Sequence, residues 1–169
     1  MLNPAITLRA ALPGDVPDLL RHMRSLADFE HYINDFTVDE KSLLARAFGP
    51  QPECHIFVAE CSDGIIGYAV GLVIPFTYDL KNTLVLKEFF VDSGYRGQGV
   101  GSALFRHVVA WALSEGGGRL KWDVLAGNQK AETFYKKHGG CPDSKWIPYV
   151  MDEDALNAAA GLNSEVKSQ

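Results

Sequence analysis

Residues 95–102 read Tyr95-Arg96-Gly97-Gln98-Gly99-Val100-Gly101-Ser102, and they lie between a predicted strand at 83–92 and a predicted helix. Glycine allows the backbone to turn with its N–H groups pointing inward, and it leaves no side chain in the way of a ligand. The helix that follows adds unpaired N–H groups and the positive end of its dipole. The segment therefore predicts an anion-binding loop of a kind suited to a pyrophosphate.

Around this loop, hydrophobic periodicity and turn residues predict a succession of strands and helices. The predicted strands are 6–11, 55–61, 65–76, 83–92, 120–125 and 148–151. The predicted helices begin at Asp15, at a capping box of Thr37 and Glu40, at Val100, at Asn128 and at Asp152. This order predicts an α/β fold with a mixed central sheet of about six to seven strands and helices on both faces. One domain is expected over 1–160, with a frayed tail at 161–169.

Other phosphate-binding loops differ from this segment in their spacing. A Walker A loop requires Gly-Lys-Ser/Thr after its glycines, and no lysine stands here. A dinucleotide-binding fingerprint counted from Gly97 needs glycine at the sixth place, where the chain has Ser102. That fingerprint also opens the first β-α-β unit of its domain, whereas several strands precede this loop. Because a single short motif can match by chance, one alternative stays open: the glycines serve only a tightly packed turn and bind no ligand.

The composition narrows the classes of function. A net charge of −5 and a pI of about 5.5 argue against nucleic acid as the main partner, because phosphate binding needs a basic face. We expect no secretory leader and no membrane span, and hence a cytoplasmic protein without a membrane partner. The 3 cysteines lack a C-x-x-C pair and the 5 histidines are scattered, so we expect no disulfide framework and no metal site.

Two segments resemble the signatures of one superfamily. Arg96, Gly99 and Gly101 match the Arg-x-x-Gly-x-Gly pattern of the acetyl-coenzyme A loop in the GNAT superfamily. Residues 128–139 resemble its second signature, an asparagine-capped helix with Phe-Tyr and a terminal glycine. The resemblance covers nearly the whole chain and is closest to the diamine (spermidine/spermine) and thialysine N-acetyltransferases. It implies a homodimer that moves acetyl from acetyl-coenzyme A to a primary amine of a small molecule by direct attack on the thioester. The amine would belong to a polyamine, a diamine or an amino-acid-like molecule.

The same resemblance assigns contacts with the cofactor. These residues are Phe89, Phe90, Val91, Arg96, Gly97, Gln98, Gly99, Val100, Gly101, Ser102, Asn128, Ala131 and Phe134. It implies that the N–H of Val91 stabilises the oxyanion and that Tyr135 protonates the departing thiolate. From the residues alone, a tyrosine packed against the sheet and an asparagine that only caps its helix are the alternatives.

Contacts with the substrate are expected from Phe29, Glu30, Asp79 and Lys87. Glu30 would attract a cationic amine and is also a catalytic candidate, taking its proton through water, although each carboxylate singly is equally explained as a solvated surface group. Lys87 departs from the resemblance, because the diamine enzymes carry a glutamate there that is often assigned as the base. A lysine repels a polyamine, so we hypothesise an amine that also bears an anionic group. Strand alternation puts Glu88 on the face opposite Lys87, so Glu88 replaces that base only if a bulge reorients it.

Other functions stay open at this point. A non-catalytic acyl-coenzyme A binder would keep the loop and lose the chemistry, and an enzyme that acetylates a protein amine would need a wide peptide groove. A dinucleotide oxidoreductase is disfavoured by the glycine spacing.

Overall fold

The computed structural model describes residues 5–75 and 78–161. The chain divides into two compact units, Met1–Ala126 and Gly127–Gln169, and each unit is described by itself. The prediction of one domain over 1–160 stays a prediction, and residues 162–169 of the predicted tail lie outside the described residues. Every helix within the described ranges is too short or too polar to cross a membrane.

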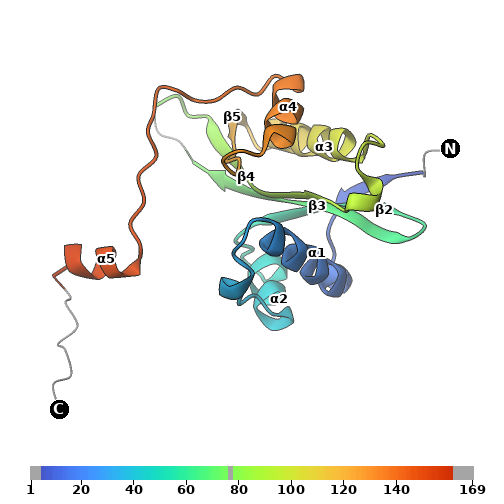
Figure 1. The fold of residues 1–169 in the computed structure, drawn as a ribbon, viewed down its shortest axis with the longest axis horizontal. Coiled ribbons are helices and arrows are strands. Elements are labelled where there is room, and N and C mark those ends of the chain that lie inside the picture. Colours follow the sequence, from blue (N-terminus) through green and yellow to red (C-terminus); the bar gives the residue numbers. More distant parts are fainter. Residues whose placement is uncertain (1–4, 76–77, 162–169) are drawn as a thin grey trace, which may run out of the picture. The chain divides into compact units, whose positions relative to one another are not determined.

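The first unit is built on one sheet (Figure 1). Its strands lie side by side in chain order: β1 (Thr7–Ala10), β2 (His55–Cys61), β3 (Gly64–Ile74), β4 (Asn82–Val91) and β5 (Gly117–Lys121). Neighbouring strands are antiparallel from β1 to β4, and β5 runs parallel to β4. The hairpin between β2 and β3 is confirmed, since Cys61 pairs with Gly64, whose φ of 100° suits glycine. Phe76, at the end of the strand predicted over 65–76, lies outside the described residues.

Helices cover both faces of this sheet, as predicted (Figure 1). On one face lie α1 (Val16–Phe29) and α2 (Glu40–Phe48), and on the other lies α3 (Val100–Ser114); short 3-10 helices span Pro13–Asp15, Ile33–Asp35 and Ser93–Tyr95. The apolar residues of α1 recur at helical spacing, and Leu19 and Met23 are among those it buries. They join Tyr68 and Phe90 of the sheet in the core beneath α1 and α2. A second apolar cluster includes Ile66, Val91 and Val100 of α3, so each face of the sheet carries its own apolar layer.

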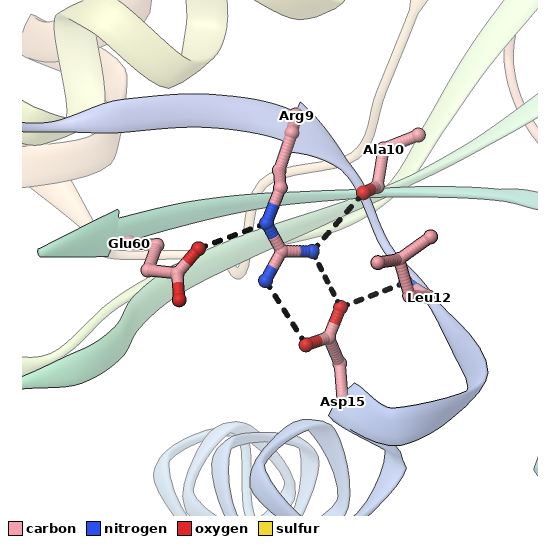
Figure 2. Close-up of polar contacts among 5 residues, drawn as sticks. All are labelled: Arg9, Ala10, Leu12, Asp15 and Glu60. Carbon is pink, nitrogen blue, oxygen red and sulfur yellow. Dashed lines mark hydrogen bonds and ion pairs between the residues drawn. The ribbon is translucent and has the colours of Figure 1, made fainter.

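An arginine on β1 ties the edge of the sheet to the start of α1 (Figure 2). Arg9 Nε donates to Glu60 Oε2 at 2.8 Å, and its terminal nitrogens donate to the Asp15 carboxylate at 2.6 and 3.0 Å. Asp15 also accepts from the backbone N–H of Leu12 at 2.7 Å. Asp15 therefore precedes the helix as predicted, but its carboxylate binds Arg9 and Leu12 and does not cap α1. We name this group the Arg9 cluster: Arg9, Asp15 and Glu60.

Within the described residues the sheet has five strands, so the prediction of six to seven is not met. The predicted last strand, 148–151, is extended chain outside any sheet. It lies in the second unit between α4 (Gln129–Lys137) and α5 (Glu153–Ala159). Its large side chains are exposed, Tyr149 and Val150 each at 94%. Aromatic and β-branched residues give a segment strand propensity, but a strand also needs a hydrogen-bonding neighbour.

The position of β5 also differs from the prediction, which was 120–125. A Cβ at Gly117 would overlap Leu84 Cδ2 and lie 2.5 Å from the carbonyl oxygen of Ala112. Glycine at 117 is thus required where the start of β5 packs closely against β4 and α3.

The cap of α2 is a further correction. Asp39 Oδ1 accepts from Ser42 N at 2.7 Å, and Ser42 Oγ accepts from Asp39 N at 3.0 Å. This is a reciprocal capping box two residues later than the predicted one at Thr37 and Glu40. Aspartate with serine and threonine with glutamate can each form a capping box, so the sequence alone could not choose between the two positions.

Candidate active site

The glycine-rich loop after β4 has the backbone conformation that its sequence predicts. Gly97 and Gly99 have φ values of 76° and 86°, a region that residues with a Cβ rarely adopt. A Cβ built at either glycine meets no atom of the described residues within 4 Å, so the space beside the loop is open. Gly99 is the N-cap of α3, and the helical ladder begins with Ala103 N donating to Gly99 O at 3.0 Å. The N–H groups of residues 100–102 precede this ladder, where an anion can accept from them.

Side chains of the loop fix it to the end of β4. Arg96 Nε donates to the carbonyl oxygen of Val91 at 2.8 Å, and its guanidinium lies 5.6 Å from the centre of the Phe90 ring. Gln98 Nε2 donates to the carbonyl oxygen of Gly94 at 2.8 Å. Arg96 and Gln98 therefore shape the loop, and their predicted contacts with the cofactor stay predictions.

The second half of β4 exposes one edge. β5 pairs with only the first four residues of β4, whereas β3 pairs with it as far as Val91. Asp92 N donates to Ile66 O at 2.9 Å, so the antiparallel alternation directs the N–H groups of Phe89 and Val91 away from β3. The bond from Arg96 to the Val91 carbonyl lies on this same side. A ligand carbonyl laid along this edge would meet backbone donors.

A bulge in β4 decides which of its residues face α1. Val70 pairs with Glu88 and Gly71 pairs with Leu86, so Lys87 is an extra residue opposite β3. Beyond the bulge, Glu88 Oε2 accepts from Tyr68 Oη at 2.7 Å, in the core beneath α1. The bulge on which the sequence made a role of Glu88 conditional is therefore present, and Glu88 joins the candidate site residues. Its only sequence signal was an acidic residue within an apolar strand.

Two carboxylates and one lysine share this region. Glu30 follows the last residue of α1, and Glu30 and Glu88 are both half-buried. Burial is the main cause that raises the pKa of each carboxyl group, while Lys87 lowers both. Glu30 adds to the rise in the pKa of Glu88. The structure thus brings the predicted residues Glu30 and Lys87 together, and we name this group the Lys87 cluster: Glu30, Lys87 and Glu88.

The other two predicted substrate residues lie differently. Phe29 is the last residue of α1, beside Glu30, and is 47% exposed. Asp79 precedes β4 and pairs with Arg119 of β5 at 2.8 Å. The first residue of β4 is six positions before Glu88, which is about 20 Å of strand. Asp79 is therefore engaged with β5 and is not gathered with the Lys87 cluster.

The second unit holds the remaining predicted residues. Asn128 Oδ1 accepts from Ala131 N at 3.1 Å, so the predicted cap of α4 is confirmed. The ring of Phe134 lies edge-on to that of Tyr135, with 5.2 Å between their centres. Because this unit is described by itself, the roles of Asn128, Ala131, Phe134 and Tyr135 at the cofactor stay predictions.

Comparison with known sequences identifies the family. The Acetyltransferase (GNAT) family matches residues 21–140. This chain belongs to the GNAT acetyltransferase family. It is 31% identical to a thialysine N-epsilon-acetyltransferase of Mus musculus, over 91% of this chain and 96% of that protein. It is 24% identical to an L-ornithine N5-acetyltransferase of Arabidopsis thaliana, over 92% and 88% of the two chains.

Solved structures show the same fold. An integron cassette protein from the mobile metagenome of V. cholerae has a TM-score of 0.76 and 23% identity to this GNAT chain, covering 92% of it and 97% of that protein. At this identity the likeness concerns the fold alone.

GNAT enzymes use acetyl-coenzyme A, and the first unit fits this co-substrate. Its pyrophosphate needs several N–H donors with open space before them, as found at Gly97, Gly99 and the start of α3. Its pantetheine arm needs a line of backbone N–H and C=O groups, as found along the edge of β4 that β5 leaves unpaired. The chain is accordingly an acetyl-coenzyme A-dependent N-acetyltransferase. In the part of the chain that the structure describes, no group of three or more His, Cys, Asp or Glu side chains is placed to hold a metal ion.

Proposed function

We propose that this enzyme acetylates the side-chain amine of a small amino-acid-like molecule. The observation that carries the proposal is the Lys87 cluster, in which two half-buried carboxylates lie near one exposed lysine. The carboxylates attract an ammonium group, and Lys87 offers a cation to an anionic group elsewhere on the same substrate. Two relatives support this choice: they are a thialysine N-epsilon-acetyltransferase and an L-ornithine N5-acetyltransferase, whose named substrates are amino acids with a side-chain amine.

Lys87 also weighs against a polyamine, which carries positive groups alone. Two like charges 4 Å apart repel by about 1 kcal/mol in water and about 4 kcal/mol near a protein surface. Lys87 is exposed, so the lower figure applies. It corresponds to a disadvantage of about fivefold for a substrate that Lys87 repels, relative to one that has no charge at that position.

The chemistry follows from the edge of β4. In the proposed reaction the Val91 N–H stabilises the oxyanion that forms when the amine attacks the thioester, since it faces the open edge of the strand. Tyr135 protonates the departing thiolate. Phe29 contributes apolar contact beside Glu30.

A panel of amines tests the substrate class. Release of free coenzyme A thiol is measured with L-ornithine, L-lysine, thialysine, putrescine and spermidine. We expect kcat/KM for the amino acids to exceed that for spermidine by about fivefold or more, and Lys87→Glu to reverse the order. If spermidine is the best substrate and Lys87→Glu changes nothing, the proposed substrate class is wrong.

The homodimer and the cytoplasmic location also stay predictions. A second copy of this chain is our proposed partner, and the exposed apolar residues of 146–151, among them Trp146, Ile147 and Tyr149, support it. Light scattering of the full-length chain would give twice the monomer mass; a monomer would refute the proposal.

A further inference from the structure

The bulge in β4 changes the face on which the rest of the strand lies. Gly71, the partner of Leu86, lies against α3, because a Cβ there would lie 2.5 Å from the Trp111 ring. Residues paired across two strands share a face, so Leu86 also faces α3. Regular alternation would then put Glu88 on that same apolar face. The extra residue at the bulge moves Glu88 to the α1 face, beside Tyr68.

Several charged or titratable groups act on the Glu88 carboxylate or respond to its charge. They are Tyr68 of β3, Glu30 directly after α1, Tyr32 before the 3-10 helix Ile33–Asp35, Lys87 of β4 and Cys54 before β2. Tyr68 is 0% exposed, so core packing holds its phenol in place. The phenol donates to Oε2 alone, which leaves Oε1 of Glu88 to accept from a further partner.

This surrounding sets how readily Glu88 accepts a proton. Burial raises the pKa of Glu88 above the ordinary carboxyl value, Tyr68 opposes the rise through its hydrogen bond, Glu30 adds to it and Lys87 lowers it. General-base catalysis is most efficient when the pKa of the base approaches the working pH. A half-buried carboxylate held by a phenol is therefore better suited to this task than a fully solvated one.

The place of Glu88 on the strand suits the same task. Glu88 lies three residues before Val91, which is about 10 Å of strand. An amine nitrogen that attacks a carbonyl held at the Val91 N–H fits within this span, directly against Glu88 or through one water. Glu30 reaches the region from α1 and adds a second negative charge for the incoming ammonium group.

We infer that Glu88 is the general base of the acetyl transfer, with Tyr68 as its positioning residue; this assignment rests on the proposed function. The Glu88 carboxylate takes one proton from the substrate ammonium, which gives a neutral amine. The nitrogen lone pair forms the C–N bond to the acetyl carbon, and the C–S bond breaks with its electron pair on sulfur. The thiolate sulfur takes a proton from the proposed acid, Tyr135, and the phenolate regains one from the second proton that leaves the substrate nitrogen. The products are the acetylated amine and coenzyme A thiol, and Glu88 returns its proton to solvent.

The first test uses the full-length chain, acetyl-coenzyme A and the best amine of the panel. Glu88→Gln should lower kcat/KM about 100-fold or more and abolish the acidic limb of its pH profile. Coenzyme A affinity by calorimetry should be unchanged. Tyr68→Phe should keep most of the activity and move the acidic limb to higher pH, because it removes the bond that opposes the rise in pKa. Glu60→Gln, at a half-buried carboxylate of the Arg9 cluster, is the control and should leave the limb in place.

A second test changes the substrate. Methoxyamine is neutral at the assay pH and needs no base, so the loss caused by Glu88→Gln should shrink to less than about tenfold with it. An equal loss with methoxyamine and with the alkyl amine would overturn the assignment, as would an acidic limb that persists in Glu88→Gln. Turnover of the alkyl amine by Glu88→Gln close to that of the wild type would thus refute the assignment of the base and leave the proposed function standing. A wild-type chain that acetylates no amine refutes the proposed function and, with it, this assignment.

Discussion

The Arg9 cluster and the Lys87 cluster each bring two carboxylates to one cation, and they differ in how fully the charges are paired. Arg9 donates to both of its carboxylates at 2.6 to 3.0 Å and joins β1, β2 and the segment before α1 (Figure 2). Lys87 acts on its two carboxylates through charge, and burial outweighs it. The guanidinium fork fits a carboxylate with two bonds, which an ammonium group cannot do.

The pKa values move in opposite directions as a result. The hydrogen bond from Arg9 holds the pKa of Asp15 below its ordinary value, whereas burial raises the pKa of Glu88 and of Glu30. A carboxylate that is fully paired stays ionised and stabilises the fold. One that is buried and partly paired is held closer to accepting a proton, which is the property a general base requires. The two clusters therefore differ in how their charges are paired and not in residue type, and the proposed general base lies in the partly paired one.

The largest expected effect on stability comes from removing each cation. Arg9→Met deletes the bonds to Asp15 and Glu60; each bond to a charged group is worth about 1.5–3 kcal/mol, and partial exposure reduces this. We expect a loss of about 2–3 kcal/mol in the free energy of unfolding. The matched variant Lys87→Met should change it by less than about 0.5 kcal/mol. Urea unfolding measures both.

Activity should show the reverse order, because Arg9→Met leaves the site intact while Lys87→Met alters substrate preference. Equal stability losses in the two variants would show that both clusters are structural and would remove the distinction.

The next effect is the pH dependence of stability. A carboxyl group with a lowered pKa, such as Asp15, stabilises the fold above its unfolded value of about 3.8, and this contribution disappears as pH falls through the lower folded value. A group with a raised pKa, such as Glu88, contributes fully below about 4.5, and its contribution is lost as pH rises through the folded value. Asp15→Asn should therefore destabilise at pH 7 by about 1.5–3 kcal/mol and little near pH 2.

Glu88→Gln should have the opposite trend, gaining stability relative to the wild type as pH rises from 4 to 8. Urea unfolding from pH 2 to 8 gives both slopes, that of Asp15→Asn below about pH 3.8 and that of Glu88→Gln above about pH 4.5. Two slopes of the same sign would contradict the assignment of opposite pKa shifts.

The sequence predicted the backbone conformation of the glycine-rich loop and the cap of α4 better than the surroundings of Glu88. Positive φ at Gly97 and Gly99 follows from glycine itself, and so does the cap at Asn128 from its amide, because these are local properties of a residue type. The acidic residue at 88 was different. The face of the sheet on which Glu88 lies depends on the register of β3 and β4. A strand sequence with regular alternation does not indicate where an extra residue is inserted.

Other misses share this dependence on distant partners. Residues 148–151 have the composition of a strand, yet they have no place in the sheet of the described residues. Gly117 belongs to β5 because Leu84 and Ala112 leave no room for a Cβ, which only the packed structure reveals. Local chemistry is encoded locally, whereas register and strand partners are set by packing.

Backbone strain provides a last distinction between the clusters. His31, next to Glu30, has a φ of 66° and ends α1 in a Schellman motif. Tyr32 N donates to Ala27 O at 2.9 Å and His31 N donates to Asp28 O at 3.2 Å, a geometry that usually uses glycine. The left-handed conformation costs a residue with a Cβ about 1–2 kcal/mol. The Arg9 cluster contains no residue with positive φ among those described.

The smallest effect follows from relieving this strain. His31→Gly removes about 1–2 kcal/mol of strain and adds about 0.4–1 kcal/mol of freedom to the unfolded chain, so stability should rise by about 0.5 kcal/mol. The looser turn holds Glu30 less firmly, and about 0.5 kcal/mol of extra ordering would raise KM for the amine about twofold. Leu80→Gly is the matched control, since Leu80 has a φ of 56° and lies before β4. It should gain stability at unchanged KM. A rise in KM in both variants, or in neither, would mean that the turn at His31 ends the helix without positioning Glu30 for the substrate.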